Sequence, residues 1–398
     1  MDLRFGEEYE VFRAEVRAFA AEHWHGAGDE TGQELREKEV RFRKLAIERG
    51  YLARSVPREY GGSEQPDDLY RGLIVGQEFG LAGCPQDPRP PVTQLIPTLL
   101  EHGTDFQKET FLPATVTGEM NWCQGYSEPG SGSDLASLTT RAELVGDEWV
   151  INGQKIWTSR SDIAEMMYLL CRTEPDAGKH AGISYFLLDM NQPGIEIQLL
   201  ATLIGETEFS QVFFNDVHTP ASHLVGKRGE GWLVSRSTLK QERGLAATAA
   251  TASGRKEFDE LVELARSVQL DGRPAIDDEN IRQRLAEIDG YLTAQESSTW
   301  IQLSCAAHNE DPGPIALMNK LVSTDIGHLV AKLTIDLMGA DALVAPSPQH
   351  RSLGNVGMSQ YLGSLGIAVA AGTSNIQRNL IGEHGLGLPR DFAAQKQK

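Results

Sequence analysis

Residues 148–157 read EWVINGQKIW, a stretch in which apolar side chains recur with a period of two around an Asn-Gly turn pair. The stretches ISYFLLDM, residues 183–190, and QVFFND, residues 211–216, share this spacing. Glycine-containing pairs at 146–147 and 193–194 bound them. This pattern predicts a β domain over residues 120–229.

On both sides of this region the apolar residues return to helical spacing. Val11, Phe12, Val16 and Phe19 form one stripe near the start of the chain. After residue 230, stretches such as IRQRLAEIDGYLTAQESS and ALMNKLVSTDIGHLVAKLTIDLM show the same period. The sequence therefore predicts an α+β protein with an N-terminal helical domain over residues 1–119 and a C-terminal helical domain over residues 230–398.

Composition excludes several classes of function. The chain has 37 basic and 56 acidic side chains and a net charge of −19, and no basic cluster that could neutralise a nucleic-acid backbone. No apolar run reaches the ~18 residues needed to cross a bilayer, and the first residues do not read as a signal peptide. The four cysteines form no CxxC pair, which argues against a disulfide framework or a metal site and favours a cytoplasmic location.

Two short segments in the β region carry groups suited to a planar or phosphorylated ligand. Residues 126–134 read YSEPGSGSD, where glycines let the backbone approach a ligand and serines add donors. Residues 155–159 read KIWTS, where an indole beside hydroxyls can cover one face of a ring system. The alternatives stay open on these residues alone: an ordinary surface turn for the first segment, and a core tryptophan for the second.

Glu242 lies in TLKQERGLAATAATA, where helical spacing puts it on one face with Leu239, Leu245 and small residues. A carboxylate on such a face loses hydration, so its pKa rises and it becomes a useful base. The alternative is a surface ion pair with a neighbour such as Arg243.

Six segments, taken in order, are similar to those of the FAD-dependent acyl-CoA dehydrogenase family. They are PREYGG, FLPATVTGE, YSEPGSGSD, NGQKIWTS, the VFFNDVHTP to LVGKRGEGW stretch, and AGTSNIQR. The resemblance covers nearly the whole chain and implies a small central β-barrel domain between a helical domain and a C-terminal four-helix bundle. The ending GTSNIQRNLIGEHGLGLPR resembles the steroid side-chain and dicarboxylic-acyl subset of that family.

The resemblance also implies roles for individual residues. The residues expected at FAD are Tyr126, Ser127, Trp157, Ser159, Arg273, Thr373 and Asn375. Those expected at the acyl-CoA substrate are Ser133, Arg243 and Ala371. No metal is expected. Family members place the catalytic base either directly before the glycine of the C-terminal motif, here Ala371, or in the first long helix after the β domain, here Glu242. Because alanine cannot take a proton, the resemblance implies that Glu242 is the base.

The implied reaction is α,β-dehydrogenation of an acyl-CoA thioester to trans-2-enoyl-CoA, with electrons passed to electron-transfer flavoprotein. The segment DGRPAIDDENIRQRLAEI and Asp336 depart from the residues that relatives supply to the FAD diphosphate across a subunit interface. Both a homotetramer and a mixed tetramer with a divergent family subunit therefore stay open. A flavin oxidase of the nitroalkane type and a non-catalytic partner subunit are the alternative functions.

Overall fold

The computed structural model describes residues 6–88, 92–243, 246–308, 310–343 and 353–389. The backbone groups into two compact units. Unit 1 comprises Met1–Leu200 and Glu208–Gln241, and unit 2 comprises Ala201–Thr207 and Glu242–Lys398. The three-domain division stays a prediction, because the N-terminal helices and the sheet belong to one unit.

Unit 1 begins with helices, as the spacing predicts. They are α1 (Glu7–His23), α2 (Gly32–Glu48), α3 (Leu69–Ala82), α4 (Val92–His102) and α5 (Asp105–Thr117). Phe12, Val16 and Phe19 of the predicted stripe are buried, whereas Val11 is exposed. Phe19 packs against Phe42 with ring centroids 5.6 Å apart, so an aromatic cluster anchors these helices.

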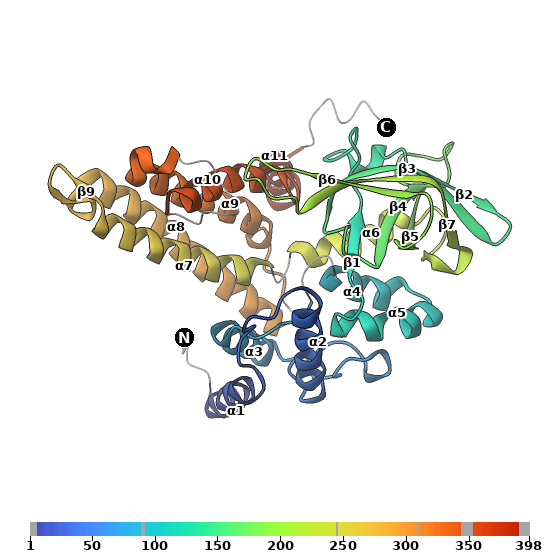
Figure 1. The fold of residues 1–398 in the computed structure, drawn as a ribbon, viewed down its shortest axis with the longest axis horizontal. Helices are drawn as coiled ribbons and strands as arrows, with labels where there is room; N and C mark the ends of the chain where they lie inside the picture. Colours follow the sequence, from blue (N-terminus) through green and yellow to red (C-terminus); the bar gives the residue numbers. More distant parts are fainter. Residues whose placement is uncertain (1–5, 89–91, 244–245, 309, 344–352, 390–398) are drawn as a thin grey trace. The chain divides into compact units, whose positions relative to one another are not determined.

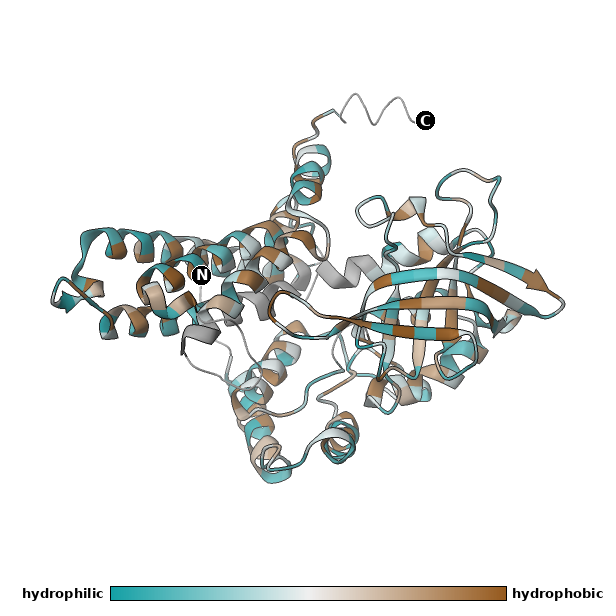
Figure 2. Cartoon of the chain, turned by 45° about the horizontal axis from the view of Figure 1, so that its top comes forward, coloured by the Kyte–Doolittle hydropathy of each residue, from teal (hydrophilic) through white to brown (hydrophobic). Residues whose placement is uncertain are grey.

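The strands of unit 1 form one sheet. They are β1 (Trp122–Gly125), β2 (Arg141–Val145), β3 (Glu148–Ser159), β4 (Met166–Arg172), β5 (Ile183–Asp189), β6 (Ile195–Leu200), β7 (Phe209–Pro220) and β8 (Leu224–Val225). Their order is β6-β7-β3-β2-β4-β5-β8, with β1 parallel to β4. Figure 1 shows them in green, and Figure 2 shows polar and apolar residues alternating along several of them.

The expected closed barrel is not observed. β6 and β8 end the pairing path, and within the described residues they do not pair with each other. Periodicity identifies strands but not the pairing that would join the two ends of a sheet. β8 has only two residues, too few to form a closing ladder, so the central region is an open sheet.

The central strands are buried on both faces, which explains their continuous apolar sequence. On one face Tyr168 and Tyr185 belong to the core formed with the helices. On the other face Trp149 and Phe186 belong to a second core within the sheet. The face with the tyrosines supports the candidate site described below.

Unit 2 is helical. Its helices are α7 (Ala246–Ser267), α8 (Glu279–Ala307), α9 (Ile315–Met338), α10 (Leu353–Val369) and α11 (Ser374–Leu380). α7, α8 and α9 share an apolar core that includes Leu261, Leu292 and Leu333, and α10 packs on α9. β9 (Gln269–Leu270) and β10 (Arg273–Pro274) form a short hairpin before α8.

α6 (Gly231–Arg243) follows the sheet. The boundary between unit 1 and unit 2 falls within this helix, after Gln241. None of the helices described here is both long enough and apolar enough to cross a bilayer.

Candidate active site

The loop after β1 carries the first group of predicted residues. Tyr126 is buried, and its ring meets those of Tyr168 and Tyr185 edge-on at 5.8 and 6.3 Å. The Tyr168 hydroxyl donates to Gln94 Oε1 of α4 at 3.2 Å. The sheet and α4 therefore fix the start of the loop, while Ser127 is half-buried beside it.

A buried ion pair ties this loop to β3. Lys155 is fully buried and Glu128 is 6% exposed. Lys155 Nζ donates to Glu128 Oε1 at 2.8 Å and to the Tyr126 carbonyl at 3.1 Å. The Ile156 amide donates to the Ser127 carbonyl at 2.9 Å. Three directed contacts thus bring residues 126–128 against the strand that carries Trp157.

The Glu128 carboxylate has further donors. Its Oε2 accepts from the Thr139 amide and hydroxyl, both at 2.7 Å, and its Oε1 accepts from the Thr140 amide at 2.9 Å. Burial alone would raise the pKa of Glu128, but Lys155 and these donors outweigh burial and lower the pKa to about 2. The carboxylate is therefore ionised at neutral pH.

This lowered pKa predicts a pH dependence of stability. The pKa of Glu128 in the folded protein lies below the ordinary value of 4.5. The ionised Glu128 therefore makes its full contribution to the free energy of unfolding above pH 4.5, and this contribution is lost as pH falls through about 2. Glu128→Gln should be less stable than the wild type at pH 7, and about 3 kcal/mol of that difference should disappear as pH falls from 4.5 toward 2. Urea unfolding of both proteins across this range measures it, and a difference that does not change with pH contradicts the assignment.

Trp157 is not a core residue, so the ordinary-core alternative is wrong. Its side chain is 59% exposed, and its backbone has a φ of 61°, which is unusual for a bulky side chain. The pairing of β3 with β7 shifts register between Ile156 and Thr158. This irregularity turns the indole outward, where Phe209 contacts it edge-on at 6.0 Å.

Hydroxyl groups hold the end of β3 in place. Ser210 Oγ of β7 donates to the Thr158 carbonyl at 3.0 Å and also contacts Ser161 Oγ. Ser159 is half-buried at the last position of β3, opposite Phe209. The hydrogen bonds from Lys155 and Ile156 thus place Tyr126 and Ser127 beside the part of β3 that leads to Trp157 and Ser159, and the roles of these four residues stay a prediction.

The glycines of the YSEPGSGSD loop face open space. The Glu128 and Ser131 backbones exchange hydrogen bonds of 2.8 and 3.0 Å across the turn. A side-chain carbon added at Gly130 or Gly132 would meet no atom within 4 Å, so packing does not explain these glycines. Ser133 is exposed directly after them. The loop leaves room for a ligand to approach its backbone.

The face of α6 that precedes Glu242 is buried and polar. Thr238 is fully buried, and its hydroxyl lies 3.0 Å from the Thr98 hydroxyl of α4. Ser237 Oγ lies 2.8 Å from His102 Nε2. The side chains of Glu242 and Arg243 lie outside the part of the chain that the structure describes.

Unit 2 places three predicted residues in one turn. After α10 ends at Val369, Ala371 has a φ of 50° and Gly372 a φ of 87°. Thr373 then caps α11 by accepting a hydrogen bond from the Ile376 amide at 3.2 Å. Asn375 is exposed in the first turn of α11. A positive φ at alanine is a strained conformation of the kind found at functional sites.

The structure does not bring Arg273 to this turn. Arg273 is exposed in β10, and its hairpin lies at the end of unit 2 opposite α11 (Figure 1). Asp336 of α9 is paired with Arg284 of α8 at 2.8 Å. Within unit 2, therefore, Arg273 and Thr373 cannot hold the same end of one ligand.

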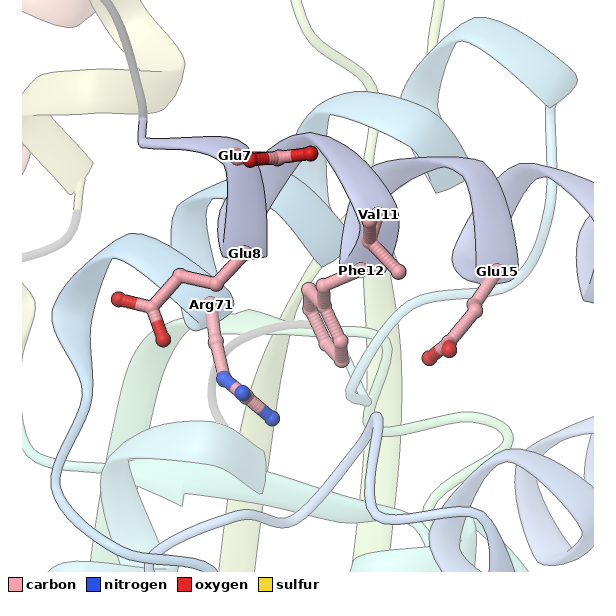
Figure 3. Close-up of a pocket in the computed structure, with 6 residues that line it drawn as sticks. All are labelled: Glu7, Glu8, Val11, Phe12, Glu15 and Arg71. Atoms are coloured by element: carbon pink, nitrogen blue, oxygen red, sulfur yellow. The ribbon is translucent and has the colours of Figure 1, made fainter.

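A surface pocket lies elsewhere in unit 1. It encloses about 400 Å³ and is lined by residues of α1 and α3 (Figure 3). Glu7, Glu8 and Glu15 line it, and Arg71 is the cationic residue among the lining side chains. This acidic lining does not suit an anionic cofactor or thioester.

Sequence reasoning missed the roles of Glu128 and Lys155. Both lie inside motifs quoted for other residues, but they are far apart along the chain, and strand alternation does not reveal which side chains meet. A lysine at an inward strand position beside apolar neighbours was the available signal, because buried lysines need a partner.

Family models match nearly the whole chain. The N-terminal domain of acyl-CoA dehydrogenases matches residues 6–119, the middle domain residues 123–217 and the C-terminal domain residues 229–386. Acyl-CoA dehydrogenase IpdE1 of Mycobacterium tuberculosis is 34% identical over 97% of this chain and 99% of its own. Acyl-CoA dehydrogenase FadE34 of the same organism is 36% identical over 87% of this chain and 46% of its own.

Solved structures agree with these sequence matches. The Tcur3481-Tcur3483 steroid ACAD has a TM-score of 0.78 and 29% identity, covering 98% of this chain and 100% of the other. The ChsE4-ChsE5 complex from Mycobacterium tuberculosis has a TM-score of 0.76 and 30% identity, with the same coverage.

Proposed function

This chain belongs to the acyl-CoA dehydrogenase family, and on that premise we propose that it oxidises an acyl-CoA between its α and β carbons, with FAD as cofactor and Glu242 as base. The product is the trans-2-enoyl-CoA. The observation that carries the proposal is the assembly of residues 126–128 with the strand end at Trp157 and Ser159.

The residues of unit 1 fit a flavin. Trp157 offers an exposed aromatic face at a fixed backbone irregularity, and such a face can cover a planar ring system. The open space above Gly130 and Gly132 lets a ligand reach the loop backbone. We assign the ring system to Tyr126, Ser127, Trp157 and Ser159. Bound FAD would supply the acceptor for the hydride that leaves the β carbon.

We assign to Glu242 the removal of the α proton from the substrate. Thr238 is buried, and helical spacing puts position 242 one turn after it. We infer that a carboxylate at position 242 would be poorly hydrated and therefore more basic. Removing the proton places negative charge on the thioester oxygen, which needs a fixed donor. We assign this role to the Ala371 amide, whose strained backbone is held between α10 and the capped start of α11. Ser133 and Arg243 are assigned to the CoA moiety.

The remaining FAD contacts are assigned to more than one subunit. Thr373 and Asn375 would hold the phosphate and adenine half, while Arg273, at the other end of unit 2, would serve a neighbouring subunit. α10 has no charged residue and exposes Leu365, Ile367 and Val369, a surface suited to subunit contact. The solved relatives include the ChsE4-ChsE5 complex, which favours a mixed tetramer over a homotetramer. Electron-transfer flavoprotein is the proposed electron acceptor.

A bulky acyl group is the proposed substrate. Alanines at positions 246, 249 and 250 follow Glu242 in the sequence, and a solved relative is described as a steroid ACAD. We expect branched or steroidal acyl-CoAs to give kcat/KM values at least about tenfold above those of straight chains. A thioester panel with an artificial electron acceptor measures this, and turnover of straight chains only contradicts the substrate class.

The reaction itself is tested by product analysis. Mass spectrometry of the thioester after anaerobic incubation should show loss of two hydrogens and a trans-2-enoyl product. A hydrolysed thioester, or a product that forms only with oxygen as acceptor, would contradict the dehydrogenase assignment. If the isolated chain binds no FAD, the same assay is repeated after co-expression with a divergent family subunit.

A further inference from the structure

The carbonyl groups of Tyr126 and Ser127, which belong to two successive peptide groups, both accept hydrogen bonds from β3. Lys155 Nζ donates to the Tyr126 carbonyl at 3.1 Å, and the Ile156 amide donates to the Ser127 carbonyl at 2.9 Å. Lys155 and Ile156 directly precede Trp157. One short piece of strand therefore sets the positions of the loop and of the indole together.

We propose that Lys155, paired with Glu128, is a positioning residue for the flavin: it locks the Tyr126–Ser127 peptide and Trp157 into a single geometry. The proposal rests on the assignment of Tyr126, Ser127 and Trp157 to the flavin. Lys155 itself is buried beneath the loop and acts through these residues.

Stability alone does not account for this pair. An apolar side chain of similar volume is often as stabilising as a buried ion pair, because both charges must lose their hydration. An apolar residue cannot, however, donate a hydrogen bond that fixes the position of the Tyr126 carbonyl. The Glu128 carboxylate is anchored by the Thr139 and Thr140 amides at 2.7 and 2.9 Å, so it holds the ammonium group at one point under the Tyr126 carbonyl.

The contact also has an electronic consequence. A cation that donates to a carbonyl polarises the whole peptide group, and in a poorly hydrated environment this effect is stronger. The peptide that begins at the Tyr126 carbonyl ends at the Ser127 amide. Lys155 therefore makes the Ser127 N–H a stronger donor, which affects the electron affinity of a ring system bound against the loop.

The test compares Lys155→Met with the double variant Lys155→Met/Glu128→Gln. The first leaves Glu128 as an uncompensated buried charge. The second removes both charges, and the carbonyl oxygen of the glutamine can still accept the two hydrogen bonds from Thr139. Lys44→Met is the matched control, because Lys44 forms a similar pair with Glu119 at 2.6 Å on the surface. Each protein is assayed for its melting temperature, its FAD dissociation constant by fluorescence, and the absorption spectrum and midpoint potential of bound FAD.

We expect Lys155→Met to melt at a lower temperature and to bind FAD at least about tenfold more weakly, since a charge-assisted hydrogen bond is lost. The double variant should regain most of the melting temperature but not the FAD affinity, and its bound FAD should have a shifted spectrum and a lower midpoint potential. Lys44→Met should match the wild type in all measurements.

A folded double variant with the wild-type FAD affinity, spectrum and midpoint potential overturns the proposal. Loss of the folded state in both variants also overturns it, because the pair would then serve folding. These results are separate from a failure of the proposed function. That failure would appear in the wild type as an absence of FAD binding or of acyl-CoA oxidation, both alone and after co-expression with a divergent family subunit.

Discussion

Glu242→Gln is expected to lower kcat/KM for the acyl-CoA substrate by at least about 100-fold, since a positioned general base typically contributes 10²–10⁴-fold. Glutamine has nearly the same shape as glutamate but cannot take a proton. The FAD content and melting temperature should therefore remain those of the wild type. Steady-state rates with the best thioester of the panel, together with the visible spectrum of the variant, measure the effect.

Two further variants make this result specific to position 242. Glu260→Gln removes an exposed carboxylate of α7 that pairs with Lys256 at 3.9 Å, and it should leave the rate unchanged. Glu242→Asp keeps a carboxylate one methylene shorter and should retain more activity than the glutamine variant. Wild-type turnover by Glu242→Gln would assign the base to another residue.

Gly231→Ala is expected to destabilise the protein by about 3 kcal/mol, at the upper end of the usual effect of overpacking. A side-chain carbon at Gly231 would lie 2.4 Å from the Ser184 carbonyl carbon and 2.7 Å from the Tyr185 nitrogen. These are backbone atoms of β5, which cannot rotate away. The first turn of α6 must then move off the sheet, and the helix that leads to Glu242 moves with it. Thermal unfolding and kcat/KM measure the two consequences.

Gly72→Ala is the matched control for this substitution. Gly72 lies inside α3, where an added side-chain carbon would meet no atom within 4 Å. Because alanine is the better helix former, this change should leave the stability equal or raise it by up to about 1 kcal/mol. Equal melting temperatures for the two variants would show that α6 is not seated on β5 as described.

The sequence predicts much of this architecture because burial controls its pattern. The alternation in residues 148–157 identifies β3, and the stripe at Phe12, Val16 and Phe19 is buried as expected. Six motifs in the order typical of the family indicated membership of the acyl-CoA dehydrogenases, and the family models confirm it. Local spacing was sufficient for these features because each depends on residues close together in the chain.

Features that depend on distant pairing were not predictable. The exposure of Trp157 follows from a register shift against β7, and no spacing within β3 indicates it. The ion pair of Lys155 and Glu128 joins a strand to a loop. The alternation of apolar residues within β3 does not indicate which acidic residue pairs with Lys155. The open edge between β6 and β8 likewise depends on which strands meet. Strand pairing is a tertiary property, and one sequence does not encode it locally.

The proposed activity is the oxidation of an acyl-CoA by a flavin held at the Tyr126 loop and Trp157. The most direct test is the visible spectrum of the FAD-loaded protein, recorded without oxygen before and after adding straight-chain, branched and steroidal acyl-CoAs. We expect the oxidised flavin bands to bleach with at least one bulky thioester. A protein that holds FAD and binds these thioesters, yet keeps its oxidised spectrum with every one of them, would not be an acyl-CoA dehydrogenase of this kind.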